Sequence, residues 1–235
     1  MIPRELEALV QRIRDEALRK KVMELLENPV FKLNGKIYSG LPLDVSPAGL
    51  SHHHSYPRGL IEHVVSSANV ALALCKSVEK VYKGKVNRDL VIAGILLHDL
   101  FKPLTYAVGE NGKYGTTELA DYMDHLSLIV SELVRRDFPL ELVHIISAHH
   151  GDHGPIRPRT IEALICHLAD MVDSRLNSEV LNAATYLVKR AIGEEMPFLT
   201  AKEAFEIVRS KNIKGMDGVI KTVEKIKRKK EVTKT

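Results

Sequence analysis

Apolar residues recur every three or four positions over most of this 235-residue chain. This period places side chains along one face of an α-helix. Such a pattern is typical of an all-α protein whose amphipathic helices pack around a shared core. It predicts helices over residues 4–27, 59–82, 88–101, 117–136, 139–150, 159–176, 178–192, 201–211 and 216–229.

Two stretches lack the helical pattern. Residues 29–57 contain four prolines and three glycines, and we interpret them as irregular. In residues 104–116 the run Glu110-Asn111-Gly112 lies between two tyrosines, which predicts a short hairpin or a mobile flap.

The distribution of charge argues against a basic body. The formal net charge is +4, but from Lys211 onward there are nine basic and three acidic residues, so residues 1–210 carry 25 − 27 = −2. We interpret the basic C-terminal tail as a solvated helix end. Only 5% of residues are aromatic and none is Trp, which disfavours a platform for stacking bases. Charge and composition therefore give no positive support for binding to a nucleic-acid polymer, and we make no prediction of it.

No segment predicts export or a membrane span. The chain is charged from its fourth residue, and its longest apolar run, 91–97, is far shorter than the ~20 residues that a span requires. The two cysteines, Cys75 and Cys166, are far apart, which argues against both a disulfide framework and a thiolate zinc site. We expect a cytoplasmic protein.

Histidine and aspartate occur together in the most apolar segments. His98 and Asp99 end the run VIAGILLHDL, where an unpaired buried carboxylate would cost several kcal/mol. His167 and Asp170, three residues apart, share a face of another apolar helix, and Asp173 continues that stripe. Each placement alone also fits a hydrogen-bonded core residue or a buried structural pair.

Further histidines follow the same rule. His63 lies on the apolar segment LIEHVV, and His149 and His150 end LVHIISAHH immediately before a glycine. We interpret His144 as a hydrogen-bonded core residue. Imidazole and carboxylate are ligands for borderline-hard divalent ions, so convergence on one metal centre would explain the other placements together.

The order His63, then His98-Asp99, then Asp170 resembles the H…HD…D signature of the HD-domain superfamily of metal-dependent phosphohydrolases. The segments HHSYPRGLIEH (53–63), AGILLHDLFK (93–102), SAHHG (147–151) and PRTIEALICHLADMVDSRL (158–176) are similar to the HD half of YhaM-type 3′-5′ exoribonucleases. The resemblance covers about residues 52–178 and implies an all-α HD-domain helical bundle with extra N- and C-terminal helices.

The resemblance also implies a ligand set. His63, His98, Asp99 and Asp170 would hold one ion, and His125, His149 and His150, with Asp99 bridging, a second. Nitrogen and oxygen ligands without thiolates suit several divalent ions. We expect Mn²⁺, with Fe²⁺, Ni²⁺, Co²⁺, Zn²⁺ and Mg²⁺ as alternatives.

These ligands predict a hydrolase in which metal-activated water attacks a phosphate ester of a nucleotide or an RNA 3′ end. We expect Asp99 and Lys102 to be catalytic, and His167 to orient the carboxylate of Asp170. Predicted substrate contacts are His53, His54, Arg157 and Arg159. Two alternatives are a di-iron oxygenase-type HD protein and a non-catalytic, metal-stabilised nucleotide-sensing module.

Two departures from the family pattern concern the substrate. Phe101 and Arg58 stand where the family has glycines, so loop contacts to the substrate are expected to differ. Residues 1–50 are too short and too helical to form the nucleic-acid-binding β-barrel that precedes the HD half in the exoribonucleases.

We therefore expect one compact domain overall: an N-terminal helix and irregular segment over 1–50, an HD metal-binding helical domain over 51–192, and C-terminal helices with a basic tail over 193–235. The expected ligand is a phosphate-ester small molecule or a short RNA, and a homo-oligomer remains an option.

Overall fold

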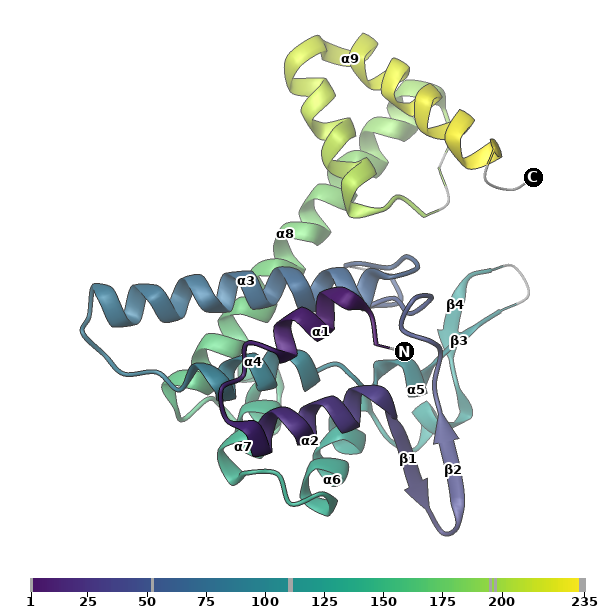
Figure 1. Ribbon diagram of the computed structural model, residues 1–235. Helices are drawn as coiled ribbons and strands as arrows, with labels where there is room; N and C mark the ends of the chain where they lie inside the picture. The colour runs from purple at the N-terminus through teal and green to yellow at the C-terminus, as the bar shows by residue number, and fades with distance from the viewer. Residues whose placement is uncertain (1, 52, 110–111, 195, 197, 233–235) are drawn as a thin grey trace.

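The computed structural model describes residues 2–51, 53–109, 112–194, 196 and 198–232, and it is predominantly helical (Figure 1). The helices are α1 (Arg4–Val10), α2 (Glu16–Glu27), α3 (Gly59–Lys80), α4 (Arg88–Leu97), α5 (Lys102–Thr105), α6 (His125–Arg135), α7 (Leu140–Ala148), α8 (Ile161–Ile192) and α9 (Ala201–Val232). Two 3₁₀ turns, η1 (Glu118–Asp121) and η2 (Gly151–His153), precede α6 and α8. The prediction of an all-α fold is confirmed.

Among the described residues, two antiparallel hairpins interrupt the helices. The pair β3 (Tyr106–Val108) and β4 (Tyr114–Thr116) confirms the hairpin expected within 104–116, although Glu110 and Asn111 lie outside the described residues. A second pair, β1 (Val30–Leu33) and β2 (Lys36–Ser39), lies in the stretch predicted to be irregular. Its turn is Asn34-Gly35, both with positive φ (48° and 76°), which is the backbone that a tight hairpin requires.

The helix predicted over 88–101 ends earlier, at Leu97. Larger differences from the predicted helix boundaries occur at three other places. The predicted helix over 4–27 is two helices, because the carboxylate of Asp15 accepts a hydrogen bond from the backbone N–H of Leu18 and begins α2. The segments 159–176 and 178–192 form one continuous helix, α8. The predicted helix over 117–136 is replaced by η1 followed by α6, whose start is capped by Asp124.

Helix α4 lies at the centre of the main core. All residues from Val91 to Leu97 are buried, and α4 packs against α1, α2, α3, α7 and α8. This burial explains why the segment is apolar on every face. It also means that the two residues after α4, His98 and Asp99, are delivered into the interior of the molecule.

The last third of the chain builds a second, smaller core. The C-terminal part of α8 packs against α9, which is broken at Gly215 (φ 63°, ψ −155°), where the sequence also predicts a break. In Figure 1 this helical pair projects away from the rest of the fold, with α8 as the connection. The buried residues of this second core are Tyr56, from the loop before α3, and Leu181, Ala184, Val188, Leu199, Ala204, Ile207, Val219, Val223 and Ile226. Within the described part of the chain, no helix has the length and apolar character to cross a membrane.

Candidate metal centre

The histidines and aspartates that come together lie at three helix ends and at positions within α3 and α8. Asp99 lies two residues after the end of α4, while His63 comes from the second turn of α3 and Asp170 from the third turn of α8. The remaining members of the group are His98 at the end of α4, His125 at the start of α6, and His149 and His150 at the end of α7.

Four of these side chains surround a common point. The Nε2 atom of His63 lies 3.1 Å from Nε2 of His98, 3.3 Å from Oδ1 of Asp170 and 3.5 Å from Oδ2 of Asp99. Ligands that each lie about 2.1 Å from one ion are separated from one another by about 3 to 3.5 Å. The spacing of the four atoms therefore fits a single divalent cation.

The hydrogen bonds of the two histidine rings support the same arrangement. Nδ1 of His63 lies 2.7 Å from a carboxylate oxygen of Asp173, and Nδ1 of His98 lies 2.9 Å from the carbonyl oxygen of Ile95. Both oxygens can only accept, so Nδ1 carries the hydrogen in each ring and Nε2 of the neutral ring has a free lone pair. Two such lone pairs at 3.1 Å are compatible only with a proton or a cation between them. Burial would lower the pKa of His63, but Asp170 and Asp173 outweigh burial and raise that pKa to about 9, so the surroundings of this ring favour positive charge at the site.

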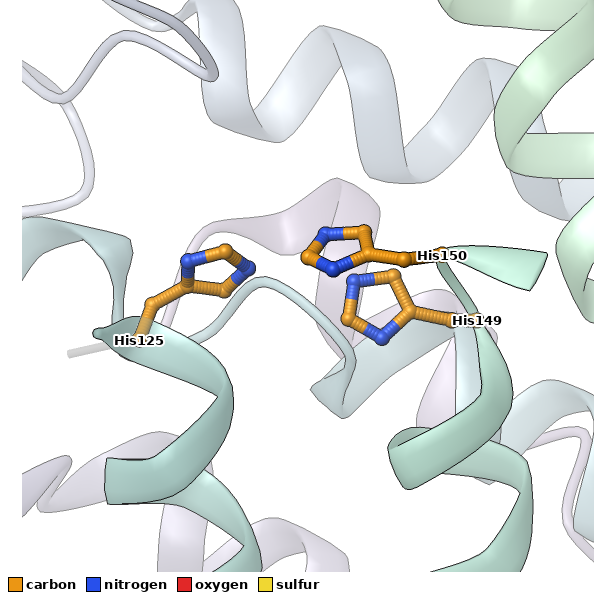
Figure 2. Close-up of side chains that lie close together, drawn as sticks. All are labelled: His125, His149 and His150. Carbon is orange, nitrogen blue, oxygen red and sulfur yellow. The ribbon is translucent and has the colours of Figure 1, made fainter. Parts of the chain in front are cut away.

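A second group lies beside the first. His125, His149 and His150 offer ring nitrogens that lie within 4.8 Å of one another, and Figure 2 shows the three rings converging from α6 and the end of α7. Oδ1 of Asp99 lies 3.4 Å from Nε2 of His125 and 3.8 Å from Nε2 of His149. Asp99 thus directs one oxygen to each group.

Three atoms of this second group are buried without a hydrogen-bond partner among the described residues: Oδ1 of Asp99, Nε2 of His125 and Nε2 of His149. Leaving a buried polar atom unsatisfied costs about 1–3 kcal/mol. Burial lowers the pKa of His149 to about 3 and that of His125 to about 4, so both rings are neutral at pH 7. Neutral, unsatisfied nitrogens beside a carboxylate fit a second cation.

Lys102 lies against the same carboxylate. Its Nζ is 2.6 Å from Oδ2 of Asp99. Burial alone would raise the pKa of Asp99, but the ammonium group of Lys102, together with the neighbouring histidines, outweighs burial and holds that pKa well below its usual range. Burial likewise opposes the charge on Lys102, but the charge of Asp99 outweighs it and raises the pKa of Lys102. The site therefore contains a fixed ammonium group.

The two loop histidines predicted to contact substrate occupy different positions. The ring of His53 lies 5.3 Å from that of His63, and its Nδ1 is buried without a partner among the described residues. His54 is only 3% exposed, and its ring nitrogens lie 2.9 Å from Asp173 and 2.9 Å from the hydroxyl of Tyr56. His54 is therefore placed behind His63, where it contacts protein groups and not the open side of the site.

The remaining predicted residues lie further out. The exposed side chain of Arg157 pairs with Asp152 at 2.9 Å, and that of Arg159 is also exposed. Nδ1 of His167 donates to the carbonyl oxygen of His149 at 2.7 Å, so its partner is this backbone and not Asp170 as predicted. His144 accepts a hydrogen bond from the backbone N–H of Arg159.

A cleft of about 550 Å³ opens beside the two groups. This volume is in the range of small-molecule binding sites. Its lining combines Asp170 and the paired histidines with residues of η2 and of α8. The lining residues are His149, His150, Asp152, His153, His167, Asp170, Met171 and Ser174.

Comparisons with known proteins agree with this geometry. Residues 60–175 match the model of the HD domain. The dihydroneopterin 2′,3′-cyclic phosphate phosphodiesterase of Methanocaldococcus jannaschii is 40% identical over 219 residues, which cover 93% of this chain and 86% of that protein.

Similarity to the YhaM exoribonucleases is more partial. The 3′-5′ exoribonuclease YhaM of Listeria monocytogenes is 36% identical over 142 residues, and that of Oceanobacillus iheyensis is 33% identical over 144. In both cases the match covers 56% of this chain but only 43% of the relative. No solved structure gives a significant match.

Proposed function

The chain belongs to the HD-domain family of metal-dependent phosphohydrolases, and we propose that it opens the 2′,3′-cyclic phosphate diester of a small, ring-containing molecule to a monoester. The observation that carries the proposal is the position of Asp99, which directs one carboxylate oxygen to each of two ligand groups beside a cleft of small-molecule size. A relative that matches along 93% of the chain is named for this class of diester.

We assign the ligands from their geometry. His63, His98, Asp99 and Asp170 would hold one ion, and His125, His149 and His150, with the second oxygen of Asp99, another. A divalent ion supplies positive charge for the phosphoryl oxygens and lowers the pKa of water towards about 7. Nitrogen and oxygen ligands suit several divalent ions, and Mn²⁺ is the one that we propose to test first.

The protein's own groups would then bind and orient the diester. Lys102 directs its ammonium group into the ligand cluster, where it can pair with a phosphoryl oxygen in addition to Asp99. The non-phosphate part of the substrate would lie in the cleft, between Met171 on α8 and His153 in η2. Met171 offers an apolar surface and Ser174 a hydroxyl, a combination suited to a ring with polar edges.

A small molecule is favoured over an RNA 3′ end, which is the second candidate. Residues 1–210 carry a net charge of −2, so the body offers no general attraction for a polyanion. The exoribonucleases match through less than half of their own length.

The decisive experiment compares diesters with metal-free and reloaded protein. After chelation, each of Mn²⁺, Fe²⁺, Co²⁺, Ni²⁺, Zn²⁺ and Mg²⁺ is added back, and 31P NMR follows dihydroneopterin 2′,3′-cyclic phosphate, 2′,3′-cyclic and 3′,5′-cyclic nucleotides, and short RNAs. We expect metal-dependent opening of 2′,3′-cyclic diesters and its loss in folded Asp99→Ala and His98→Ala variants.

Three other results would each favour a different function. Shortening of RNA without opening of any cyclic diester would favour the second candidate. Turnover that consumes oxygen would indicate oxygenase chemistry. Stabilisation by metal with no turnover of any ester would indicate a non-catalytic module.

A further inference from the structure

A chain of buried hydrogen bonds leads away from the candidate metal centre on the side opposite its ligand atoms. It begins at Nδ1 of His63, which donates to Asp173 at 2.7 Å, and continues from Asp173 to Nε2 of His54 at 2.9 Å. Nδ1 of His54 then lies 2.9 Å from the hydroxyl of Tyr56. We infer that Asp173, His54 and Tyr56 are positioning residues through which the C-terminal helical pair sets the orientation and tautomer of His63.

Asp173 is the central member of this chain. One oxygen, Oδ2, faces both His63 and His54, and the side chain is only 4% exposed. Asp173 lies three residues after Asp170, on the same face of α8, so this helix supplies both a proposed ligand and the partner of a second ligand. A carboxylate that holds the far nitrogen of a ligating histidine fixes its ring and its tautomer.

The group His54, His63 and Asp173 is itself close enough to suggest a metal site. Its hydrogen bonds argue against that interpretation. The carboxylate oxygen lies 2.7 and 2.9 Å from the two ring nitrogens, and neither nitrogen nor oxygen lacks a partner. The group therefore satisfies itself by hydrogen bonding, unlike the neighbouring group of His125 and His149.

Tyr56 connects this chain to the C-terminal helices. Its side chain is fully buried and belongs to the second core, together with residues of α8 and α9 such as Leu181 and Val223. The hydroxyl donates to Glu62 at 2.8 Å, which fixes its direction. The backbone N–H of His54 donates to Asn177 of α8 at 2.7 Å, so the loop is held at two points.

These contacts give the C-terminal helices a role in the site. The match to the HD domain ends at residue 175, before Asn177 and before the apolar residues that pack around Tyr56. The helical pair lies outside that match, but it buries the tyrosine whose hydroxyl holds His54. Loss of any link would release the next one towards His63.

The chemistry makes the inference testable by a single atom change. With a carboxylate at position 173, Nδ1 of His63 carries the hydrogen and Nε2 presents its lone pair to the ligand cluster. In Asp173→Asn the amide can donate to Nδ1, which favours the tautomer with hydrogen on Nε2. That tautomer cannot bind a cation through Nε2.

The experiment compares three full-length variants: Asp173→Asn, Tyr56→Phe and, as a matched control, Tyr114→Phe. The hydroxyl of Tyr114 also makes a hydrogen bond, to the carbonyl oxygen of Val45 at 2.6 Å, but it has no part in the chain. Calorimetric titration with Mn²⁺ measures affinity. 15N imidazole spectra of the metal-free protein, recorded above the His63 pKa of about 9 so that the ring is neutral, report its tautomer.

We expect Asp173→Asn to weaken Mn²⁺ binding about 10- to 100-fold and to shift hydrogen onto Nε2 of His63. Tyr56→Phe should weaken binding in the same direction by a smaller factor, and Tyr114→Phe should leave it unchanged. In the proposed hydrolysis, kcat should fall while KM changes little.

Unchanged affinity and tautomer in folded Asp173→Asn would overturn the inference. Equal behaviour of Tyr56→Phe and Tyr114→Phe would overturn the part that concerns the C-terminal helices. If Asp173→Asn does not fold, Tyr56→Phe decides by the same measurements. The inference rests on the proposed metal site, but its readouts use Mn²⁺ and the free protein alone, so its failure leaves the proposed diesterase activity to be judged separately.

Discussion

The ammonium group of Lys102 lies 2.6 Å from Oδ2 of Asp99, the oxygen that also faces His63. One carboxylate oxygen is thus shared between a lysine and a candidate cation. Without substrate, the ammonium group and a bound cation would compete for the carboxylate of Asp99. With substrate, both positive charges could pair with the phosphate diester. Lys102 should therefore affect metal binding and catalysis in opposite directions.

We predict that Lys102→Met strengthens Mn²⁺ binding and lowers kcat by about 100-fold. Removing the ammonium group takes away a repulsive charge near the cation, but it also removes a donor to the developing phosphoryl charge. Titration calorimetry and steady-state kinetics measure the two effects. Lys85→Met, at an exposed position, is the control for loss of a lysine. Weaker metal binding together with full activity would contradict this role of Lys102.

His125 separates the two proposed cation positions. It contributes to the second group only, whereas Asp99 faces both. We predict that His125→Ala lowers the bound metal from two ions to one, and that Asp99→Ala lowers it further. Elemental analysis of purified, untagged protein gives the stoichiometry. Two ions retained in His125→Ala would mean that this histidine is not a ligand.

The sequence predicts which helices carry the ligand candidates, because the apolar pattern of each helix is local in the sequence and the order of His63, His98, Asp99 and Asp170 resembles a family signature. Contacts between side chains and segments that are distant in the sequence are harder to predict from the sequence. Helical spacing placed His167 beside Asp170, but the ring bonds to the backbone of His149, since a helix face says nothing about which neighbouring backbone covers it.

The loop before α3 shows the same limit. His53 and His54 are adjacent in sequence, yet one borders the site and the other lies behind His63, because His54 has a positive φ of 45° that turns the chain. The hairpin β1–β2 had a usable signal in Asn34-Gly35. The prolines and glycines around this dipeptide led us to interpret the whole stretch as irregular.

A buried ion pair away from the site predicts how stability depends on pH. Glu132 on α6 is only 1% exposed, and its carboxylate accepts hydrogen bonds from Arg135 and Arg136. Burial raises the pKa of Glu132, but these hydrogen bonds outweigh burial and lower it below its usual value. The carboxylate is therefore ionised in the folded protein at a pH where it would be protonated in the unfolded chain.

A lowered folded pKa adds stability above the unfolded pKa of about 4.3, and this contribution is lost as the pH falls through the folded value. We predict that Glu132→Gln costs about 1–2 kcal/mol at pH 7, since Arg135 is half exposed, and that the difference from wild type shrinks below about pH 4. Urea unfolding at several pH values measures it. A difference that grows at low pH would contradict the sign.

Gly151 couples the turn after α7 to the second ligand group. Its φ is +58°, and a Cβ at this position would lie 2.3 Å from Cε1 of His167. The ring of His167 holds the carbonyl oxygen of His149, so displacing it would release the backbone that carries two ligand candidates.

Gly193 is the matched control, because its φ is +74° but a Cβ there would meet nothing within 4 Å. Both Gly→Ala changes pay the left-handed backbone strain of about 1–2 kcal/mol. Only Gly151→Ala also moves His167, and we predict that it alone weakens binding of the second Mn²⁺ ion. Chemical unfolding measures the shared strain, and calorimetric titration measures the ion. Equal metal binding in the two variants would show that the turn does not need the His167 contact to hold His149 and His150 in place.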